Sequence, residues 1–267
     1  MSERVKVTIE GGVADVRLAR PEKLNGLDLA MFEALAREGR ALADDRSLRA
    51  VVLSGEGRAF SAGLDFQSFL SGGASGDRPD LLRRDDSWPA NFAQSAAYVW
   101  TALPAPVIAA VHGYAFGGGL QIALAADIRI VAPDAQLSVM EIKWGLIPDM
   151  TGSQRLRHLV RLDVAKELTF TGRIVSGEEA VGLGLATRVA EDPRAAALEL
   201  AREIAGKSPD AIRAAKELLE QSWDEPLRAG LEREERLQRG LMGSPNQREA
   251  VQANLERRAP HFRDPER

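Results

Sequence analysis

The sequence has no cysteine and only three histidines among its 267 residues. Without cysteine, disulfide bonds and thiolate-bound metal sites are excluded, and three scattered histidines argue against a histidine metal cluster. No apolar run approaches the ~20 residues that a membrane-spanning helix requires. The first residues, Met1 to Arg4, run directly into a strand-like pattern and do not resemble a signal peptide. These absences predict a cytoplasmic protein with no membrane partner.

An excess of positive charge is also missing. Lys and Arg number 35 against 39 for Asp and Glu, so the formal net charge is −4. A mildly acidic chain argues against a nucleic-acid-binding surface. Hydrophobic residues make up 45% of the chain, enough for a substantial core. The length fits one large domain or one domain with a helical appendage.

Residues 106–126 are the most informative stretch. The apolar run Val107 to Val111 has the length of a buried strand, and Gly117, Gly118 and Gly119 follow it, before a segment of helix formers. Glycines expose the backbone, and the first N–H groups of a helix have no intrahelical acceptor. This turn therefore suits an anion or a developing oxyanion. Tight packing between strand and helix is the alternative. The spacing is neither a dinucleotide-binding fingerprint nor a P-loop.

A second small-residue turn, Arg58 to Asp65, follows the apolar strand Val51 to Leu53. Two such turns after two strands could direct two N–H groups at one carbonyl oxygen. Together with Arg20 to Leu27 and the segment from Glu141 to Leu156, these turns resemble the crotonase (enoyl-CoA hydratase/isomerase) superfamily. The motifs match in order and spacing, and the resemblance covers nearly the whole chain.

The resemblance implies an α/β (α+β) fold. Residues 1–190 would form a crotonase-like spiral of β-β-α units, and residues 191–267 a C-terminal helical trimerisation region. Superfamily members assemble into homotrimers, often paired into hexamers (dimers of trimers). The sequence itself predicts a hairpin from Val5 to Leu18 and a helix over 29–43 capped by Asp28. Prolines in the C-terminal region predict helix starts: Pro193, Pro209, Pro226 and Pro245.

The segment 71–90 interrupts this pattern with glycine, serine and charged residues. Such a composition predicts a loop. One interpretation is a disordered surface insertion. The other, which the resemblance favours, is a lid beside the acyl pocket.

The implied ligand is an acyl-CoA thioester. The resemblance assigns the oxyanion hole for its carbonyl oxygen to the backbone N–H groups of Ala62 and Gly118, and the hypothesis requires both nitrogens to be free of bonds within the protein. Negative charge collects on that oxygen when the α-proton leaves, and one such donor contributes ~2.7–4 kcal/mol of transition-state stabilisation. No metal or redox cofactor is expected, because coenzyme A is part of the substrate.

The carboxylates select the reaction. In hydratases of the superfamily two glutamates hold the attacking water. Here Gln121 occupies the first position, and an amide cannot exchange a proton at ordinary pH. Glu141 occupies the second position, between Met140 and Ile142, where burial would raise its pKa toward that of a useful base. Without the resemblance, a capping or surface carboxylate would be the simpler interpretation of Glu141.

Asp149 stands where many hydratases have glycine and some isomerases have aspartate. It is either a second catalytic carboxylate or the N-cap of a helix that begins near Thr151. With Glu141 and Asp149 on one side of an enolate, a proton could leave one carbon and return at another. The sequence therefore favours double-bond isomerisation over trans-2-enoyl-CoA hydration, in which Glu141 would activate water and Gln121 would position it. A non-catalytic acyl-CoA-binding or assembly protein is the third interpretation.

Coenzyme A carries phosphates, which need local cations in an acidic chain. The resemblance also implies Arg20 near the nucleotide end, and Arg258 could reach the site of a neighbouring subunit. It places these residues around coenzyme A: Lys23, Leu24, Arg58, Ala59, Leu64 and Asp65.

Overall fold

The computed structural model describes residues 3–71 and 80–265. Within these residues the larger sheet has the strand order β1-β2-β3-β4-β6-β9. The first pair is antiparallel, from Val5 opposite Leu18 to Glu10 opposite Val13, so the predicted hairpin is confirmed. The later neighbours are parallel. The bounds are β1 (Val5–Glu10), β2 (Val13–Leu18), β3 (Ala50–Gly55), β4 (Val107–Val111), β6 (Ile128–Val131) and β9 (Arg188–Val189).

A smaller sheet positions the candidate site. Its order in the described part of the chain is β5 (Tyr114–Phe116), β7 (Gln136–Ser138) and β8 (Val175–Ser176). The strand, turn and helix predicted over 106–126 therefore contain an additional strand, because the chain leaves β4 and joins this second sheet before the glycines. A parallel bridge between Ser61 and Ala115 fastens the second predicted turn beside β5.

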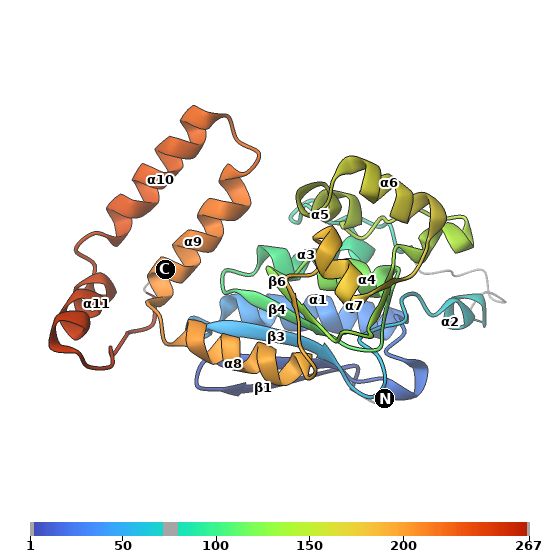
Figure 1. Ribbon diagram of the computed structural model, residues 1–267, viewed down its shortest axis with the longest axis horizontal. Helices are drawn as coiled ribbons and strands as arrows, with labels where there is room; N and C mark the ends of the chain where they lie inside the picture. Colours follow the sequence, from blue (N-terminus) through green and yellow to red (C-terminus); the bar gives the residue numbers. More distant parts are fainter. Residues whose placement is uncertain (1–2, 72–79, 266–267) are drawn as a thin grey trace.

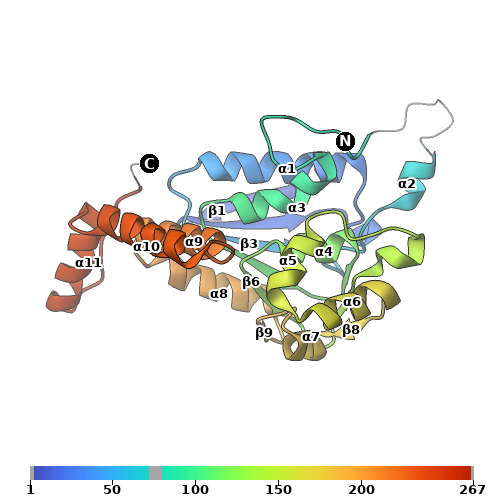
Figure 2. The same ribbon diagram turned by 90° about the horizontal axis from the view of Figure 1, so that it is seen from above.

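Helices cover both faces of the larger sheet (Figure 2). On one face lie α1 (Leu29–Asp44) and α3 (Phe92–Ala102), whose buried side chains belong to the main hydrophobic core. On the other face α8 (Pro193–Ala205) buries Ala197 and Ala201 against the strands in a separate cluster. Because both faces are covered, the central strands are buried throughout.

The cap predicted for α1 is confirmed. The Asp28 carboxylate accepts a hydrogen bond of 2.9 Å from the Met31 N–H and forms an ion pair of 2.7 Å with Arg4. The core also contains shorter helices: η1 (Pro21–Lys23), which precedes α1, and then α2 (Phe66–Ser71), α4 (Gly118–Leu124), η3 (Met140–Trp144), α5 (Gly152–Leu159), α6 (Leu162–Thr171) and α7 (Gly177–Leu183).

The C-terminal helices α9 (Pro209–Ser222), α10 (Leu227–Leu241) and α11 (Pro245–Glu256) project from one side of the core (Figure 1). Proline begins α8, α9 and α11, and Pro226 is the N-cap of α10. The boundary predicted at residue 190 precedes α8, which packs on the sheet. Because α8 packs against the sheet, the region that projects from the core begins at α9.

Part of the predicted loop 71–90 lies outside the described residues, namely 72–79, so the lid stays a prediction. From Asp80 the chain forms turns that lead to α3, where Asn91 and Gln94 cap one another's backbone N–H groups. None of the helices in the described ranges combines the length and apolarity that a membrane span requires.

Candidate active site

The glycine turn places an unpaired N–H group at the start of α4. Gly117 has a φ of +51°, and its N–H donates to Ser138 O at 3.0 Å. Gly118 is the first residue of the helix, and its N–H has no acceptor among the described residues. A free N–H at a helix start is a donor for an oxyanion.

The second turn lies against the first. The Ser61 N–H donates to Tyr114 O at 2.9 Å, and the Phe116 N–H returns a bond of 3.0 Å to Ser61 O. Gly63 has a φ of +82°, and a Cβ atom on it would lie 2.5 Å from Phe116 O and 3.5 Å from Gly118 N. Only glycine allows this approach, so the two turns meet as the sequence predicts.

The donor predicted in the second turn, the Ala62 N–H, is wrong. The Ala62 N–H donates to Leu24 O at 2.9 Å and is not available to a ligand. Leu24 has a φ of +50°, which turns this part of the chain back toward the second turn. The oxyanion hole therefore cannot use Ala62 in this conformation.

Leu64 supplies the free donor instead. It forms a parallel bridge with Leu27, in which Leu27 N–H donates to Gly63 O at 2.8 Å and Asp65 N–H donates to Leu27 O at 3.0 Å. Both bonds are made by the neighbours of Leu64, so the N–H of Leu64 itself points away from Leu27. The Leu64 N–H accordingly has no acceptor within the described ranges. Sequence alone contained no signal for this shift.

Glu141 lies beside the glycine turn. It is 8% exposed on η3, and a Cβ atom on Gly117 would lie 3.4 Å from its Oε1. Oε1 accepts a hydrogen bond of 2.6 Å from Gln121 Nε2. Oε2 is buried and lacks a partner in the described structure. Burial raises the pKa of Glu141, and the charge of Asp149 adds to the increase, as a general base requires.

Gln121 joins Glu141 to the segment that carries Asp149. Its side chain projects from α4, and the residue is 2% exposed. Its Oε1 accepts hydrogen bonds of 2.7 Å from Met150 N and 2.9 Å from Gly152 N. These contacts commit the Gln121 amide to protein groups, whereas the sequence analysis considered it as a residue that positions a water molecule.

Asp149 is not a helix cap. The N-cap of α5 is Thr151, with a φ of +72° and no side-chain bond to the helix. Asp149 is exposed as a residue, yet neighbouring protein atoms remove enough water from its carboxyl group to raise the pKa. Gln121 Oε1 accepts from the N–H of Met150, the residue after Asp149, so Asp149 lies on the segment that Gln121 joins to Glu141. A catalytic role for Asp149 stays a prediction.

The residues predicted around coenzyme A divide into exposed and structural groups. Lys23 and Arg58 are exposed and, among described residues, form no ion pair. Leu24 O is used by Ala62, and Ala59 O accepts from Asn25 Nδ2 at 2.8 Å. These two carbonyls therefore fasten the second turn.

Two of the predicted charges have structural partners. Arg20 is 7% exposed and pairs with Asp65 at 2.8 Å, so its guanidinium is committed to the protein and not to a phosphate. Arg258 pairs with Glu249 and Glu256 near the end of α11, both at 2.6 Å. Lys23 and Arg58 remain as the exposed cations of the predicted set.

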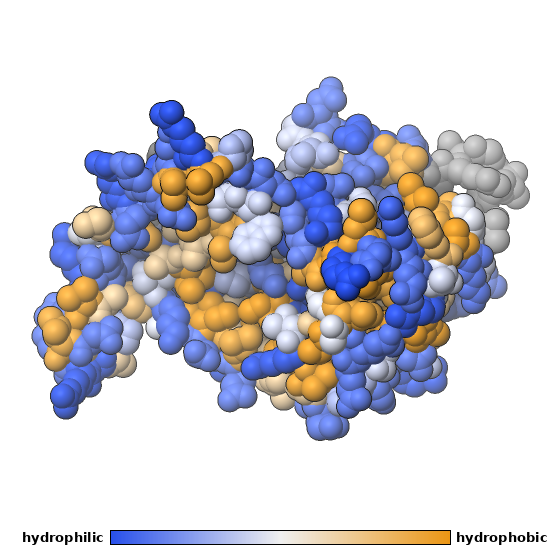
Figure 3. All heavy atoms as spheres, turned by 45° about the horizontal axis from the view of Figure 1, so that its top comes forward, coloured by the Kyte–Doolittle hydropathy of each residue, from blue (hydrophilic) through white to orange (hydrophobic). Residues whose placement is uncertain are grey.

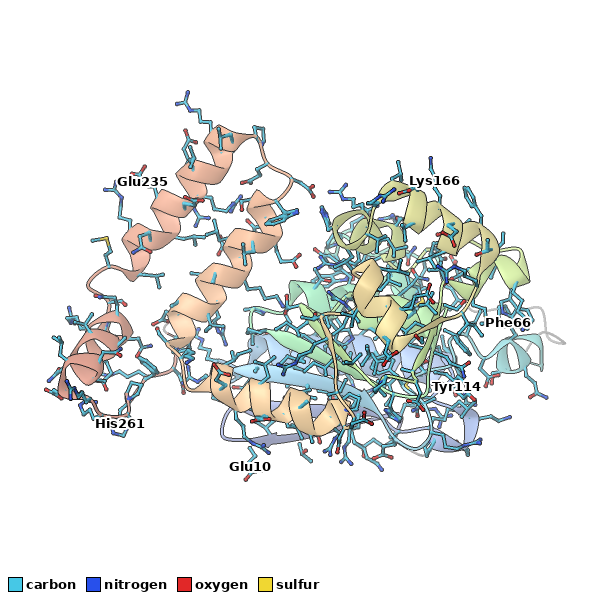
Figure 4. All side chains as sticks on the ribbon, viewed as in Figure 1. Glu10, Phe66, Tyr114, Lys166, Glu235 and His261 are labelled. Carbon is cyan, nitrogen blue, oxygen red and sulfur yellow. The ribbon has the colours of Figure 1, made fainter. Side chains whose placement is uncertain are left out.

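An aromatic pair that the sequence analysis missed borders the site. Phe66 and Trp144 stack with ring centroids 4.2 Å apart, and Trp144 is 52% exposed. Trp144 follows Glu141 by three residues on η3, and residues three apart in a 3-10 helix lie on the same face. Figure 4 shows Phe66 on α2 at the edge of the core. The pair provides an apolar surface next to the base.

A cleft lies elsewhere in the described structure, away from the glycine turn. It has a volume of about 1180 Å³ between α3 and α5 of the core and the projecting helices α9 and α10. Its lining does not include Glu141, Gly118 or Leu64. The chemistry available at the glycine turn, namely proton removal next to a carbonyl held by two N–H groups, does not depend on this cleft.

The chain is similar to known proteins over most of its length. The family model described as enoyl-CoA hydratase/isomerase matches residues 8–265. The chain is 33% identical to the probable enoyl-CoA hydratase echA8 of Mycobacterium tuberculosis over 262 residues, 97% of this chain and 98% of that protein. It is 36% identical to the carnitinyl-CoA dehydratase of Salmonella agona over 233 residues, 86% of this chain and 85% of that protein.

Solved structures give the same result. A putative enoyl-CoA hydratase from Streptomyces coelicolor superposes with a TM-score of 0.89 at 34% identity, covering 97% of this chain and 94% of that chain. An enoyl-CoA hydratase from Bacillus anthracis superposes with a TM-score of 0.87 at 33% identity, covering 97% and 98%.

Proposed function

Because the chain belongs to the enoyl-CoA hydratase/isomerase family and is an enzyme that acts on acyl-CoA, we propose that it catalyses double-bond isomerisation of an enoyl-CoA. The observation that carries the proposal is the Gln121 amide, which is occupied by protein partners and joins the buried Glu141 carboxylate to Met150, the residue after Asp149. Two titratable groups then face the substrate, and neither requires a water molecule as reactant.

The proposed reaction proceeds through an enolate. The thioester oxygen accepts hydrogen bonds from the N–H groups of Leu64 and Gly118. Glu141 Oε2 removes a proton from the α-carbon, and the electron pair moves onto that oxygen. When the electrons return, the double bond shifts and the γ-carbon takes a proton from the protonated form of Asp149. Proton exchange with solvent restores both groups. These proton transfers call for no metal or redox cofactor.

Hydration is the second candidate. It is supported by the names of the relatives, since echA8 is a probable enoyl-CoA hydratase and the Salmonella protein a carnitinyl-CoA dehydratase. In that case Glu141 would activate a water molecule, and Gln121 would have only its remaining N–H for it.

Separate incubations with a 3-enoyl-CoA and a trans-2-enoyl-CoA distinguish the candidates. Isomerisation predicts that the first substrate is converted to its 2-enoyl isomer without water uptake, as followed by absorbance and mass spectrometry. Fast water addition to the second substrate, with no positional shift in the first, would contradict the proposal.

We further propose that the enzyme forms a homotrimer, or a hexamer of two trimers, through the C-terminal helices. The support is apolar exposure. Leu227 is 79% exposed, Leu255 80% and Trp223 68%, and Figure 3 shows apolar side chains in orange over these helices.

Lys23 and Arg58 are proposed to meet the phosphates of coenzyme A.

A further inference from the structure

We propose that Gln121 is a positioning residue, whose single amide group fixes both the Glu141 carboxylate and the Pro148–Met150 turn that carries Asp149. This inference rests on the proposed function. It assigns to Gln121 a role in aligning the two carboxylates, in place of contact with water or substrate.

The orientation of the Gln121 amide is determined by its partners. Met150 N–H and Gly152 N–H can only donate, so the atom that faces them, at 2.7 and 2.9 Å, must be the oxygen. The nitrogen therefore faces Glu141 Oε1, at 2.6 Å. With two bonds to its oxygen and one from its nitrogen, the buried amide has no second orientation that satisfies these groups.

Gly152 makes room for this contact. A Cβ atom on Gly152 would lie 2.6 Å from Gln121 Oε1 and 3.0 Å from its Cδ. Gly152 is not among the residues with positive φ, so its lack of a side chain matters for close approach and not for backbone conformation. At Gly117 the reverse holds, because a Cβ atom there would lie 3.4 Å from Glu141 Oε1, an ordinary contact, whereas the φ of +51° favours glycine.

The contact decides which oxygen of Glu141 can react. Oε1 is occupied by the Gln121 N–H, whereas Oε2 is buried and unpartnered in the described structure. The amide donor also stabilises the ionised form, against the burial and the Asp149 charge that favour protonation. Two other charged groups belong to neighbouring parts of the chain. Lys143, on the same η3 helix, holds its ammonium 5.7 Å from the centre of the Trp144 ring. Asp149 is the charge that shifts the pKa of Glu141.

The decisive variant is Gln121→Glu, which keeps the shape of the side chain. A carboxylate at this position can still accept from Met150 N and Gly152 N, but the pair can form a hydrogen bond with Glu141 only while one of the two carboxyl groups is protonated. The introduced carboxyl group and that of Glu141 would then share one proton and titrate as a pair, and repulsion between the two charges raises the upper pKa of the pair. We expect the acidic limb of the kcat/KM profile to move to higher pH, with KM little changed.

A second variant tests the position without altering the charge. Gly152→Ala should push the Gln121 oxygen away and reduce kcat about 100-fold, because a displacement near 1 Å in a catalytic group has that effect. Gly182→Ala is the matched control, since a Cβ atom there meets nothing within 4 Å. It should leave kcat and the pH profile unchanged.

The readouts separate this inference from the proposed function. Exchange of the thioester α-proton in D2O reports Glu141 activity in an isomerase or a hydratase, and carboxyl ¹³C NMR of the free enzyme reports the Glu141 titration without turnover. A parent enzyme that lacks exchange would contradict the proposed function alone. An unshifted Glu141 titration in Gln121→Glu, or unchanged kcat in Gly152→Ala, would overturn the positioning role.

Discussion

At the scale of single residues, Glu141 has the environment of a general base. Its carboxyl group is buried beside the glycine turn, one oxygen is held by Gln121, and the other lacks a partner within the described structure. An unsatisfied buried acceptor costs stability and is kept where a functional site requires it.

Glu141→Gln should lower kcat by about 10²–10⁴-fold, the usual contribution of a positioned general base. The amide is isosteric and can accept the Gln121 N–H, so KM for the acyl-CoA should change little. Steady-state kinetics with a 3-enoyl-CoA measures this, and Glu178→Gln, at an exposed position of α7, is a control. Turnover equal to that of the parent would remove Glu141 from the mechanism.

The same variant should be more stable than the parent at neutral pH. Burial raises the pKa of Glu141 above its ordinary value of 4.5. At a pH between the ordinary pKa and the raised pKa of the folded state, the folded protein therefore binds more protons than the unfolded chain. The free energy of unfolding therefore falls as pH rises through this interval, and Glu141→Gln avoids that loss. Thermal unfolding should show a Tm gain at pH 7 that disappears below pH ~4. A gain that is equal at both pH values would contradict the assignment.

At the scale of elements, the site depends on the contact between two turns from different sheets. The bridge between Ser61 and Ala115 and the close approach of Gly63 to Phe116 O bring the Leu64 and Gly118 N–H groups to one place. Neither turn presents two donors to a carbonyl oxygen without the other.

Gly63→Ala should separate the turns. The added Cβ atom would lie 2.5 Å from Phe116 O, at a residue with a φ of +82°, so the second turn must move. Loss of one oxyanion donor predicts a fall in kcat of about 10²–10³-fold. Gly240→Ala, where nothing lies within 4 Å, should retain full activity. Kinetics and near-ultraviolet circular dichroism would show whether the turn moves while the core remains folded.

At the scale of the whole molecule, the projecting helices are incompletely covered by this chain. Exposed Trp223, Leu227 and Leu255 lie on or beside α9, α10 and α11. Such apolar exposure is typical of surfaces that another subunit covers. We therefore expect assembly, and not catalysis, to depend most directly on these helices.

The double variant Leu227→Glu and Leu255→Glu should convert the assembly to monomers, because a carboxylate is costly to bury in an apolar interface. Light scattering after size-exclusion chromatography measures the mass. Leu82→Glu is the control, since Leu82 is 61% exposed outside these helices. A parent that is already monomeric would contradict the proposed assembly.

The sequence by itself determined the family, the first hairpin and the two turns that follow apolar strands, and it singled out Glu141 as the candidate base. These features depend on local patterns: apolar runs of strand length, glycines where the backbone must approach, and helix starts at proline or aspartate. The cap at Asp28 and the hairpin from Val5 to Leu18 are confirmed for the same reason.

Tertiary structure decided which groups are free. Ala62 lost its proposed role because Leu24, from a separate and earlier part of the chain, accepts its N–H, and Leu64 gained it. Likewise Gln121 is committed to Glu141 and to Met150 through contacts between separate elements. Whether a donor is available depends on partners distant in sequence, and local residue patterns do not contain that information.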